Sequence, residues 1–127
     1  MKEEIIDYWI DKSRKSLKSA ILEYQQGYLD FSVNRLYYAV FYITSAYFFQ
    51  NGKYFKKHSG LRASFHKEIV KKGKIDKVYG KLYDELFEAR EEGDYKPFAS
   101  FEKEQVEEWI KLTEEFIEKM EALIRNT

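Results

Sequence analysis

Hydrophobic side chains recur every three or four positions along most of the chain, which is the spacing of one face of an α-helix. No segment alternates between apolar and polar positions for long enough to be a β-strand. The spacing predicts five helices, over residues 3–26, 30–50, 59–73, 75–93 and 100–123. We therefore expect an all-α fold, an antiparallel up-and-down helical bundle that forms a single domain over residues 1–127.

Residues with special backbone or capping properties stand between these periodic segments. The pair Asn51-Gly52 breaks the second helix, and the side chains of Asp30 and Ser100 are suited to cap the second and fifth helices. Pro97 makes helix unfavourable through the segment GDYKPFAS, which is therefore expected to be the main loop.

The second expected helix contains NRLYYAVFYITSAYFFQ, residues 34–50, the densest aromatic stretch of the chain. Its apolar side chains cover every face, and a helix that is apolar all round is buried all round. We therefore expect it to be the central element of the bundle. Burial does not explain Asn34 and Arg35, which stand at the start of this stretch.

Composition excludes several classes of protein. The absence of cysteine excludes a disulfide, a thiolate nucleophile and a cysteine–zinc site. The first fifteen residues hold no apolar signal-peptide core, and the longest uncharged run, 36–51, is shorter than the roughly 20 residues that cross a bilayer. We expect a soluble, cytoplasmic protein without membrane contact.

The formal net charge of zero hides an uneven distribution. Residues 51–81 hold ten Lys and Arg against two acidic side chains, whereas residues 82–127 hold six against fourteen. A basic segment beside an acidic one can attract a polyanion, a partner or a second copy of the chain. Alternatively, the two segments are solvated helix faces that neutralise each other across the bundle.

Most familiar catalytic arrangements are absent from the sequence. A di-iron bundle needs Glu-x-x-His pairs, and neither His58 nor His66 has a glutamate three residues before it. There is no Gly-x-Ser-x-Gly turn and no Gly-rich phosphate loop. No metal and no cofactor is expected.

A few polar residues stand in apolar surroundings. Arg90 and Asp94 are spaced i, i+4, within pairing reach if the fourth helix extends that far, and Tyr95 follows directly. Arg62 and His66 have the same spacing on the third helix. A structural ion pair explains the first pair as readily as a site does, and an exposed histidine explains the second.

Three segments in this order, SVNRLYYAVFY, KHSGLRASFHKEIVKKGKI and LFEAREEGDY, resemble the HEPN domain family (higher eukaryotes and prokaryotes nucleotide-binding). The resemblance covers about residues 16–123. It implies a HEPN-like helical bundle that forms a homodimer. It also implies a separately encoded minimal nucleotidyltransferase as partner, in a module of the toxin–antitoxin type. Other members of the family are metal-independent ribonucleases.

The ribonuclease members carry an arginine and, after four to six residues, a histidine. Histidine can move protons at the reacting oxygens while arginine stabilises the charge on the phosphate. In this chain only three residues separate Arg62 from His66, and the fifth residue after Arg90 is Tyr95, a poor base because its pKa is about 10. Arg90 with His66 is the catalytic pair expected here, with His58 as the alternative histidine, and whether the chain is an enzyme stays open.

We expect the fold to gather one polar pocket from distant segments. Its ligand-binding residues are expected to be Asn34, Arg35, Tyr38, His58, Arg90, Asp94 and Tyr95. Guanidinium groups bind phosphate and aromatic rings stack on bases, so the expected ligand is a nucleotide or RNA. A buried network that only fixes the helix register is the competing interpretation.

Three functions follow, in order of preference. The first is a homodimeric HEPN protein that acts with nucleotide or RNA as partner of a minimal nucleotidyltransferase. The second is a metal-independent endoribonuclease. The third is a non-catalytic assembly module that uses its charged segments only to bind other proteins.

Overall fold

The computed structural model describes residues 1–126 of the chain, and in these residues it contains helices and no strand. The elements in chain order are α1 (Lys2–Gln25), α2 (Leu29–Gln50), α3 (His58–Phe65), the π-helical turn η1 (His66–Val70), α4 (Lys77–Tyr95) and α5 (Lys103–Arg125). The predicted all-α bundle of five helices is therefore confirmed.

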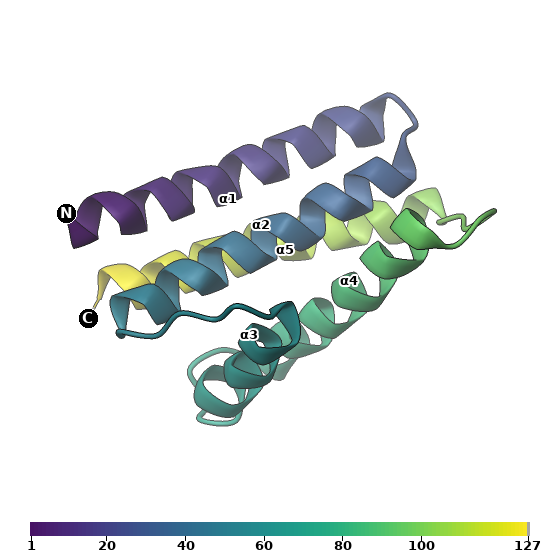
Figure 1. Cartoon of the computed structure of the whole chain (residues 1–127). Helices are drawn as coiled ribbons and strands as arrows, with labels where there is room; N and C mark the ends of the chain where they lie inside the picture. Colours follow the sequence, from purple (N-terminus) through teal and green to yellow (C-terminus); the bar gives the residue numbers. More distant parts are fainter. Residues whose placement is uncertain (127) are drawn as a thin grey trace.

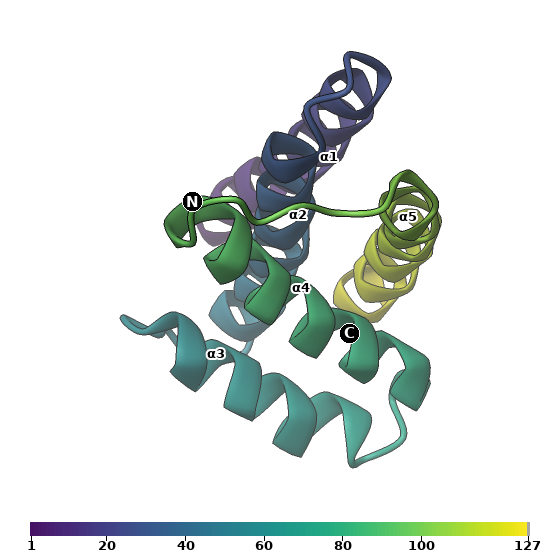
Figure 2. The ribbon, with the colours of Figure 1, turned by 90° about the vertical axis from the view of Figure 1, so that its right-hand side faces the viewer.

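Helix α2 lies at the centre of the bundle and packs against α1, α3, α4 and α5. Figure 1 shows α1, α2 and α5 side by side, with both termini at the same end. Turned by 90°, the molecule shows α3 and α4 as a second pair that crosses the direction of α2 (Figure 2). This crossing brings the ends of α3 and α4 close to α2, where the polar residues of the aromatic stretch lie.

Small residues allow α1 and α2 to approach closely, and serines hold the two helices in register. Ser13 and Ser16 of α1 donate hydrogen bonds of 2.6 Å to the carbonyl oxygens of Ala39 and Arg35. In the opposite direction, Ser32 donates to a carbonyl oxygen of α1 at 2.8 Å. All three serines are buried, so these bonds satisfy hydroxyl groups that would otherwise be costly in the core.

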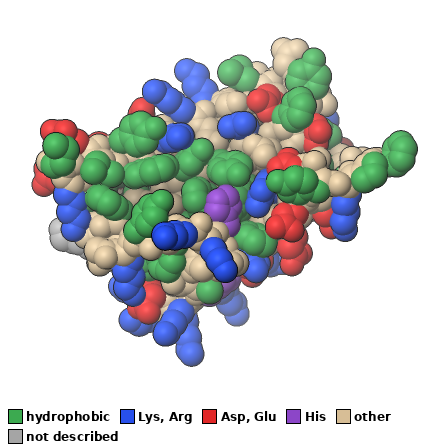
Figure 3. Space-filling view, viewed as in Figure 1, with side chains coloured by type: hydrophobic (Ala, Val, Ile, Leu, Met, Phe, Trp, Pro, Cys, Tyr) green, Lys and Arg blue, Asp and Glu red, His purple; other side chains and the backbone are tan. Residues whose placement is uncertain are grey.

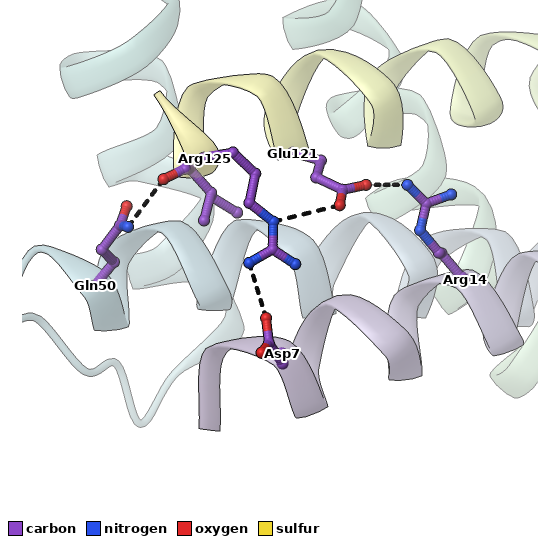
Figure 4. Close-up of polar contacts among 6 residues, drawn as sticks. Asp7, Arg14, Gln50, Glu121 and Arg125 are labelled. Atoms are coloured by element: carbon purple, nitrogen blue, oxygen red, sulfur yellow. Dashed lines mark hydrogen bonds and ion pairs between the residues drawn. The ribbon is translucent and has the colours of Figure 1, made fainter. Parts of the chain in front are cut away.

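Ion pairs join α1 to the last turns of α5 (Figure 4). Arg125 donates to Asp7 at 2.8 Å and also lies 3.5 Å from Glu121, which pairs with Arg14. Gln50 at the end of α2 donates to the carbonyl oxygen of Ile124 at 2.9 Å. These pairs are largely exposed, so they orient the two helices rather than supply much stability.

Two of the expected caps are wrong. Asp30 lies inside the first turn of α2, with Tyr28 at the N-cap position, and α5 begins at Lys103, beyond Ser100. A capping residue must lie just before the first helical residue, and both helices start elsewhere. Helix α4 has a cap that the sequence reading missed, since the Asp76 carboxylate accepts a bond of 2.9 Å from the Val78 amide.

The ends of two further helices differ from expectation. The predicted third helix is α3 followed by η1, and a π-helical turn has no signature in the hydrophobic spacing. Helix α4 continues past Gly93 to Tyr95, because glycine is tolerated in a helix at a cost of about 1 kcal/mol. The continuation matters, since it keeps Asp94 on the same helical face as Arg90.

The expectation that α2 is buried all round is also wrong. Tyr38, Phe41, Tyr42, Ser45 and Phe49 form a stripe that is only half-buried. Helices α1 and α3 only partly cover this stripe, where Trp9 packs against Tyr42 and His58 against Phe41. Figure 3 shows hydrophobic side chains gathered on this face of the molecule. The central helix therefore contributes directly to the surface.

Candidate functional site

Arg90 brings its guanidinium group into the bundle from the last turns of α4. Its side chain is only 10% exposed, and its Cζ lies 4.7 Å from the centre of the Tyr37 ring and 5.9 Å from that of Tyr38. Both distances are typical of cation–π contacts. The Nε atom is buried without a hydrogen-bond partner among residues 1–126.

Asp94 supplies the nearest negative charge and ties α4 to α2. Its Oδ2 atom lies 4.0 Å from Nη1 of Arg90, too far for a hydrogen bond. The same oxygen accepts a 3.0 Å bond from Nδ2 of Asn34. Asn34 therefore holds Asp94 beside Arg90, which explains the polar residue at the start of the aromatic stretch.

His58 reaches the same place from the first residue of α3. Its Nδ1 lies 2.8 Å from the hydroxyl oxygen of the buried Tyr37, so the two groups share one hydrogen bond. The His58 ring also lies 4.3 Å from the Phe41 ring, and its other nitrogen, Nε2, makes no bond within the described part of the chain. Tyr37 thus contacts both Arg90 and His58.

The electrostatics of the cluster favour a neutral imidazole. Burial and the positive charge of Arg90 both lower the pKa of His58 below its usual 6.5. Burial raises the pKa of the Tyr37 phenol, an effect that the charge of Arg90 only partly offsets. At neutral pH the cluster therefore holds one cation, one neutral histidine and one neutral phenol.

The structure brings together five of the seven predicted ligand-binding residues: Asn34, Tyr38, His58, Arg90 and Asp94. The other two lie apart from them. Tyr95, the last residue of α4, is 74% exposed. Arg35 is exposed and its side chain pairs with none of residues 1–126.

Arg35 lines an open hollow of about 600 Å³ beside this cluster, and the charge of that hollow is unexpected. Its lining consists of Glu23, Asp30, Phe31, Asn34, Arg35, Gly93 and Asp94. Three carboxylates therefore face one guanidinium. The hollow therefore carries a net negative charge.

The predicted catalytic His66 lies elsewhere. Its Nε2 is 2.8 Å from Oδ1 of Asp84, and Arg62 donates to the same oxygen at 3.2 Å. Asp84 precedes Arg90 by six residues on α4, which is about 9 Å along the helix. The His66 ring packs over Gly80, where an added Cβ would lie 3.1 Å from its Cε1 atom. Arg62 and His66 thus both interact with the Asp84 carboxylate.

Two residues that contact His58, Tyr37 and Phe41, were not predicted as part of the site. Both lie in the aromatic stretch, at positions whose helical spacing is typical of the hydrophobic core. The only available signal was the i, i+3 and i, i+4 spacing from Asn34, which places Tyr37 and Tyr38 next to it on the helix.

The basic segment 51–81 keeps most of its charge unpaired. Only Arg62 and Lys81 form ion pairs with carboxylates of residues 82–126. Seven lysines form no ion pair within residues 1–126: Lys53, Lys56, Lys57, Lys67, Lys71, Lys74 and Lys77. Helix α5 holds seven acidic side chains, and its contact with α3 is between the rings of Phe116 and Phe65, whose centroids are 5.4 Å apart. The pairs of Arg62 and Lys81 are therefore the ion pairs that join the two segments within residues 1–126.

The protein is thus a small five-helix bundle whose fourth helix places a buried arginine against the second helix. The family model named HEPN domain matches residues 6–123, and the chain belongs to that family.

Curated relatives agree with this assignment. A UPF0332 protein of Thermotoga maritima is 44% identical over 125 residues, which are 98% of this chain and 95% of that protein. The protein named "Putative toxin MJ0142" of Methanocaldococcus jannaschii is 33% identical over 98 residues, 77% of this chain and 67% of the relative. A second protein of that organism, "Putative toxin MJ0605", is 25% identical over 122 residues, 96% and 90% of the two chains.

None of the helices formed by residues 1–126 is both long enough and apolar enough to cross a membrane.

The position of His58 beside Arg90 predicts a pH response. Because the folded-state pKa lies below the unfolded value of 6.5, His58 contributes stability that is complete above pH 6.5 and is lost as the pH falls below it. A proton NMR titration of the His58 ring should give a midpoint below 6.5. The midpoint should rise in Arg90→Met, which removes the neighbouring charge and keeps the aliphatic bulk. An unchanged midpoint in Arg90→Met, with Arg14→Met as control, would contradict this geometry.

Proposed function

We propose that this HEPN domain protein binds a phosphate-bearing ligand, a nucleotide or RNA, at the cluster of Asn34, Tyr38, His58, Arg90 and Asp94. We further propose that it works as a homodimer in a module of the toxin–antitoxin type, with a separately encoded minimal nucleotidyltransferase as partner. Arg35 and Tyr95 complete the predicted set but lie outside this cluster.

The unsatisfied guanidinium of Arg90 carries this proposal. A buried charge is normally paired and hydrogen-bonded, because desolvating it costs several kcal/mol. Arg90 has only a 4.0 Å ion pair, two aromatic faces and a buried Nε without an acceptor. A phosphate group has the charge and the oxygens that would satisfy these donors.

The residues around Arg90 favour one direction of approach for a phosphate-bearing ligand. The hollow beside Asn34 carries three carboxylates, whereas the Tyr38 ring packs against the rings of Tyr37 and His58. The half-buried Tyr38 ring can stack on a base while the phosphate meets Arg90. The unpaired lysines of segment 51–81 would add long-range attraction for RNA.

Replacing Arg90 should weaken the binding of nucleotide or RNA. A hydrogen bond to a charged group contributes about 1.5–3 kcal/mol, so Arg90→Met should raise the Kd about 10- to 100-fold. Tyrosine fluorescence during titration with nucleoside triphosphates and with short RNAs would measure this. Arg14→Met, which removes an arginine from the α1–α5 contact, is the matched control and should bind as the parent does. Equal binding by Arg90→Met would leave the cluster as a network that fixes the helix register.

The names of the two Methanocaldococcus relatives support the toxin–antitoxin part of the proposal. A toxin of this kind needs a partner that restrains it, and the exposed hydroxyl of Tyr95 is available to a modifying enzyme. Nucleotidyl transfer would join the phenol oxygen to the α-phosphate of a nucleoside triphosphate and release pyrophosphate and the phenol proton.

Purification of a tagged chain from its native cells should therefore recover a nucleotidyltransferase. Intact mass should show some molecules heavier by one nucleotidyl group, and Tyr95→Phe should abolish the extra mass, because the acceptor oxygen is gone. Tyr54→Phe, which removes another exposed phenol, is the control. Recovery of other proteins only, with no added mass, would favour the assembly module.

A second function, a metal-independent endoribonuclease, is favoured by the placement of His58 rather than His66 beside Arg90. Neutral His58 can take the proton of a ribose 2′-hydroxyl through Nε2. The 2′-oxygen then attacks the phosphorus and displaces the 5′-oxygen, which takes a proton from water. Arg90 would stabilise the charge that develops on the phosphate.

RNA cleavage in EDTA would test this function. General base catalysis contributes about 100-fold or more, so His58→Gln should lose at least that factor while His66→Gln keeps the parent rate. The rate should hold as the pH falls toward 6.5 and decline only below it, because the lowered pKa keeps His58 neutral. Cleavage that depends on His66 instead would restore the pair suggested by the family resemblance. No cleavage across many RNAs would exclude the activity.

A further inference from the structure

A largely apolar, partly open cavity lies on the face of the molecule that the half-buried stripe of α2 helps to form (Figure 3). Its lining comes from α1, from α2, from the segment between α2 and α3, and from α3 itself: Trp9, Phe41, Ser45, Phe49, Lys53, Tyr54, Phe55 and Leu61. Five of these eight residues are aromatic. The cavity is separate from the acidic hollow beside Asn34, with which it shares no residue.

The volume of the cavity limits the size of the ligand. Its volume is about 190 Å³. An apolar cavity of about 150 Å³ in a helical protein is known to hold benzene, so this one can hold a single aromatic ring with a small substituent. Flat walls of Trp9 and Phe41 suit edge-to-face or offset packing against such a ring.

The polar groups of the lining specify the substituent. Lys53 is the only charged residue among them, and it has no ion pair within residues 1–126. Ser45 donates its proton to the carbonyl oxygen of Phe41 at 2.8 Å, so its hydroxyl is already committed as a donor. No carboxylate belongs to the lining, so Lys53 would attract a negative charge on the ligand, although Glu68 close to Lys53 offsets part of this attraction.

We propose that this cavity is a binding site for a small aromatic anion, a single ring that carries a carboxylate, with the ring among Trp9, Phe41 and Phe49 and the carboxylate at Lys53. The site is linked to the polar cluster through Phe41. One side of the Phe41 ring lines the cavity, and the ring also lies 4.3 Å from the His58 imidazole. A bound ring that shifts Phe41 therefore changes the surroundings of His58.

Titration with benzoate, followed by two-dimensional NMR, would test the site. The indole N–H signal of Trp9 should shift and saturate. That of Trp109, which donates to Glu85 on α4, is an internal control and should stay in place. The His58 ring signal should shift together with Trp9. Benzyl alcohol, which has the ring without the charge, should bind about fivefold or more weakly, as expected for one partly exposed ion pair.

Matched variants test the contribution of the Lys53 charge separately from that of the cavity volume. Lys53→Met should reduce benzoate affinity about fivefold and leave benzyl alcohol unchanged, while Lys56→Met should match the parent. Ser45→Leu fills the cavity and should abolish binding of both compounds. If Ser45→Leu does not fold, Lys53→Met still tests the proposal, provided that this variant unfolds at the same temperature as the parent.

Three results would overturn the proposal. The first is the absence of a saturable Trp9 shift, and the second is equal affinity for benzoate and benzyl alcohol in every variant. The third is a Trp9 shift that follows protein concentration rather than benzoate, with a matching dimer in sedimentation velocity, since a second copy would then be the occupant. None of these results bears on binding at Arg90, because the phosphate titration uses a different ligand and a different variant.

Discussion

A single buried guanidinium organises the polar half of this bundle. Desolvating a charge is costly, so a nine-tenths buried arginine persists only where the fold compensates it. Arg90 is compensated by the ring of Tyr37 from α2 and by the carboxylate of Asp94 on its own helix. The bond from Asn34 to Asp94 and the bond between Tyr37 and His58 extend this compensation to α2 and α3. The register of three helices is therefore linked to one charge.

The same charge sets the chemistry of its neighbours. Burial lowers the pKa of His58 and the positive charge of Arg90 lowers it further, so the imidazole is neutral at neutral pH. The adjacent hollow holds three carboxylates around Arg35. A cluster centred on an arginine and a hollow rich in carboxylates therefore lie within a few residues of each other on α2. The incomplete compensation of Arg90 is the physical basis for expecting a phosphate there.

Phe41 links the polar cluster to the aromatic cavity on the same face. It is one of the half-buried residues of α2, and it contacts both His58 and the cavity. A helix that is apolar on every side could have been enclosed on every side. Because α3 and α4 cross the direction of α2 rather than lying along it, one stripe of α2 stays half-buried.

The sequence alone determined the helices, the central place of α2 and the i, i+4 relation of Arg90 to Asp94. Hydrophobic spacing and helix geometry act over a few residues, so they can be recognised without the tertiary structure. Gathering Asn34, Tyr38 and Asp94 around Arg90 was predictable only with the family resemblance. The choice between His58 and His66 was not predictable, since the two lie eight residues apart on one periodic segment. Nor were the packing of Tyr37 under Arg90, the exposure of Arg35 and Tyr95, or the open stripe of α2. These depend on the crossing of α3 and α4 over α2, which is decided by contacts between residues far apart in the chain.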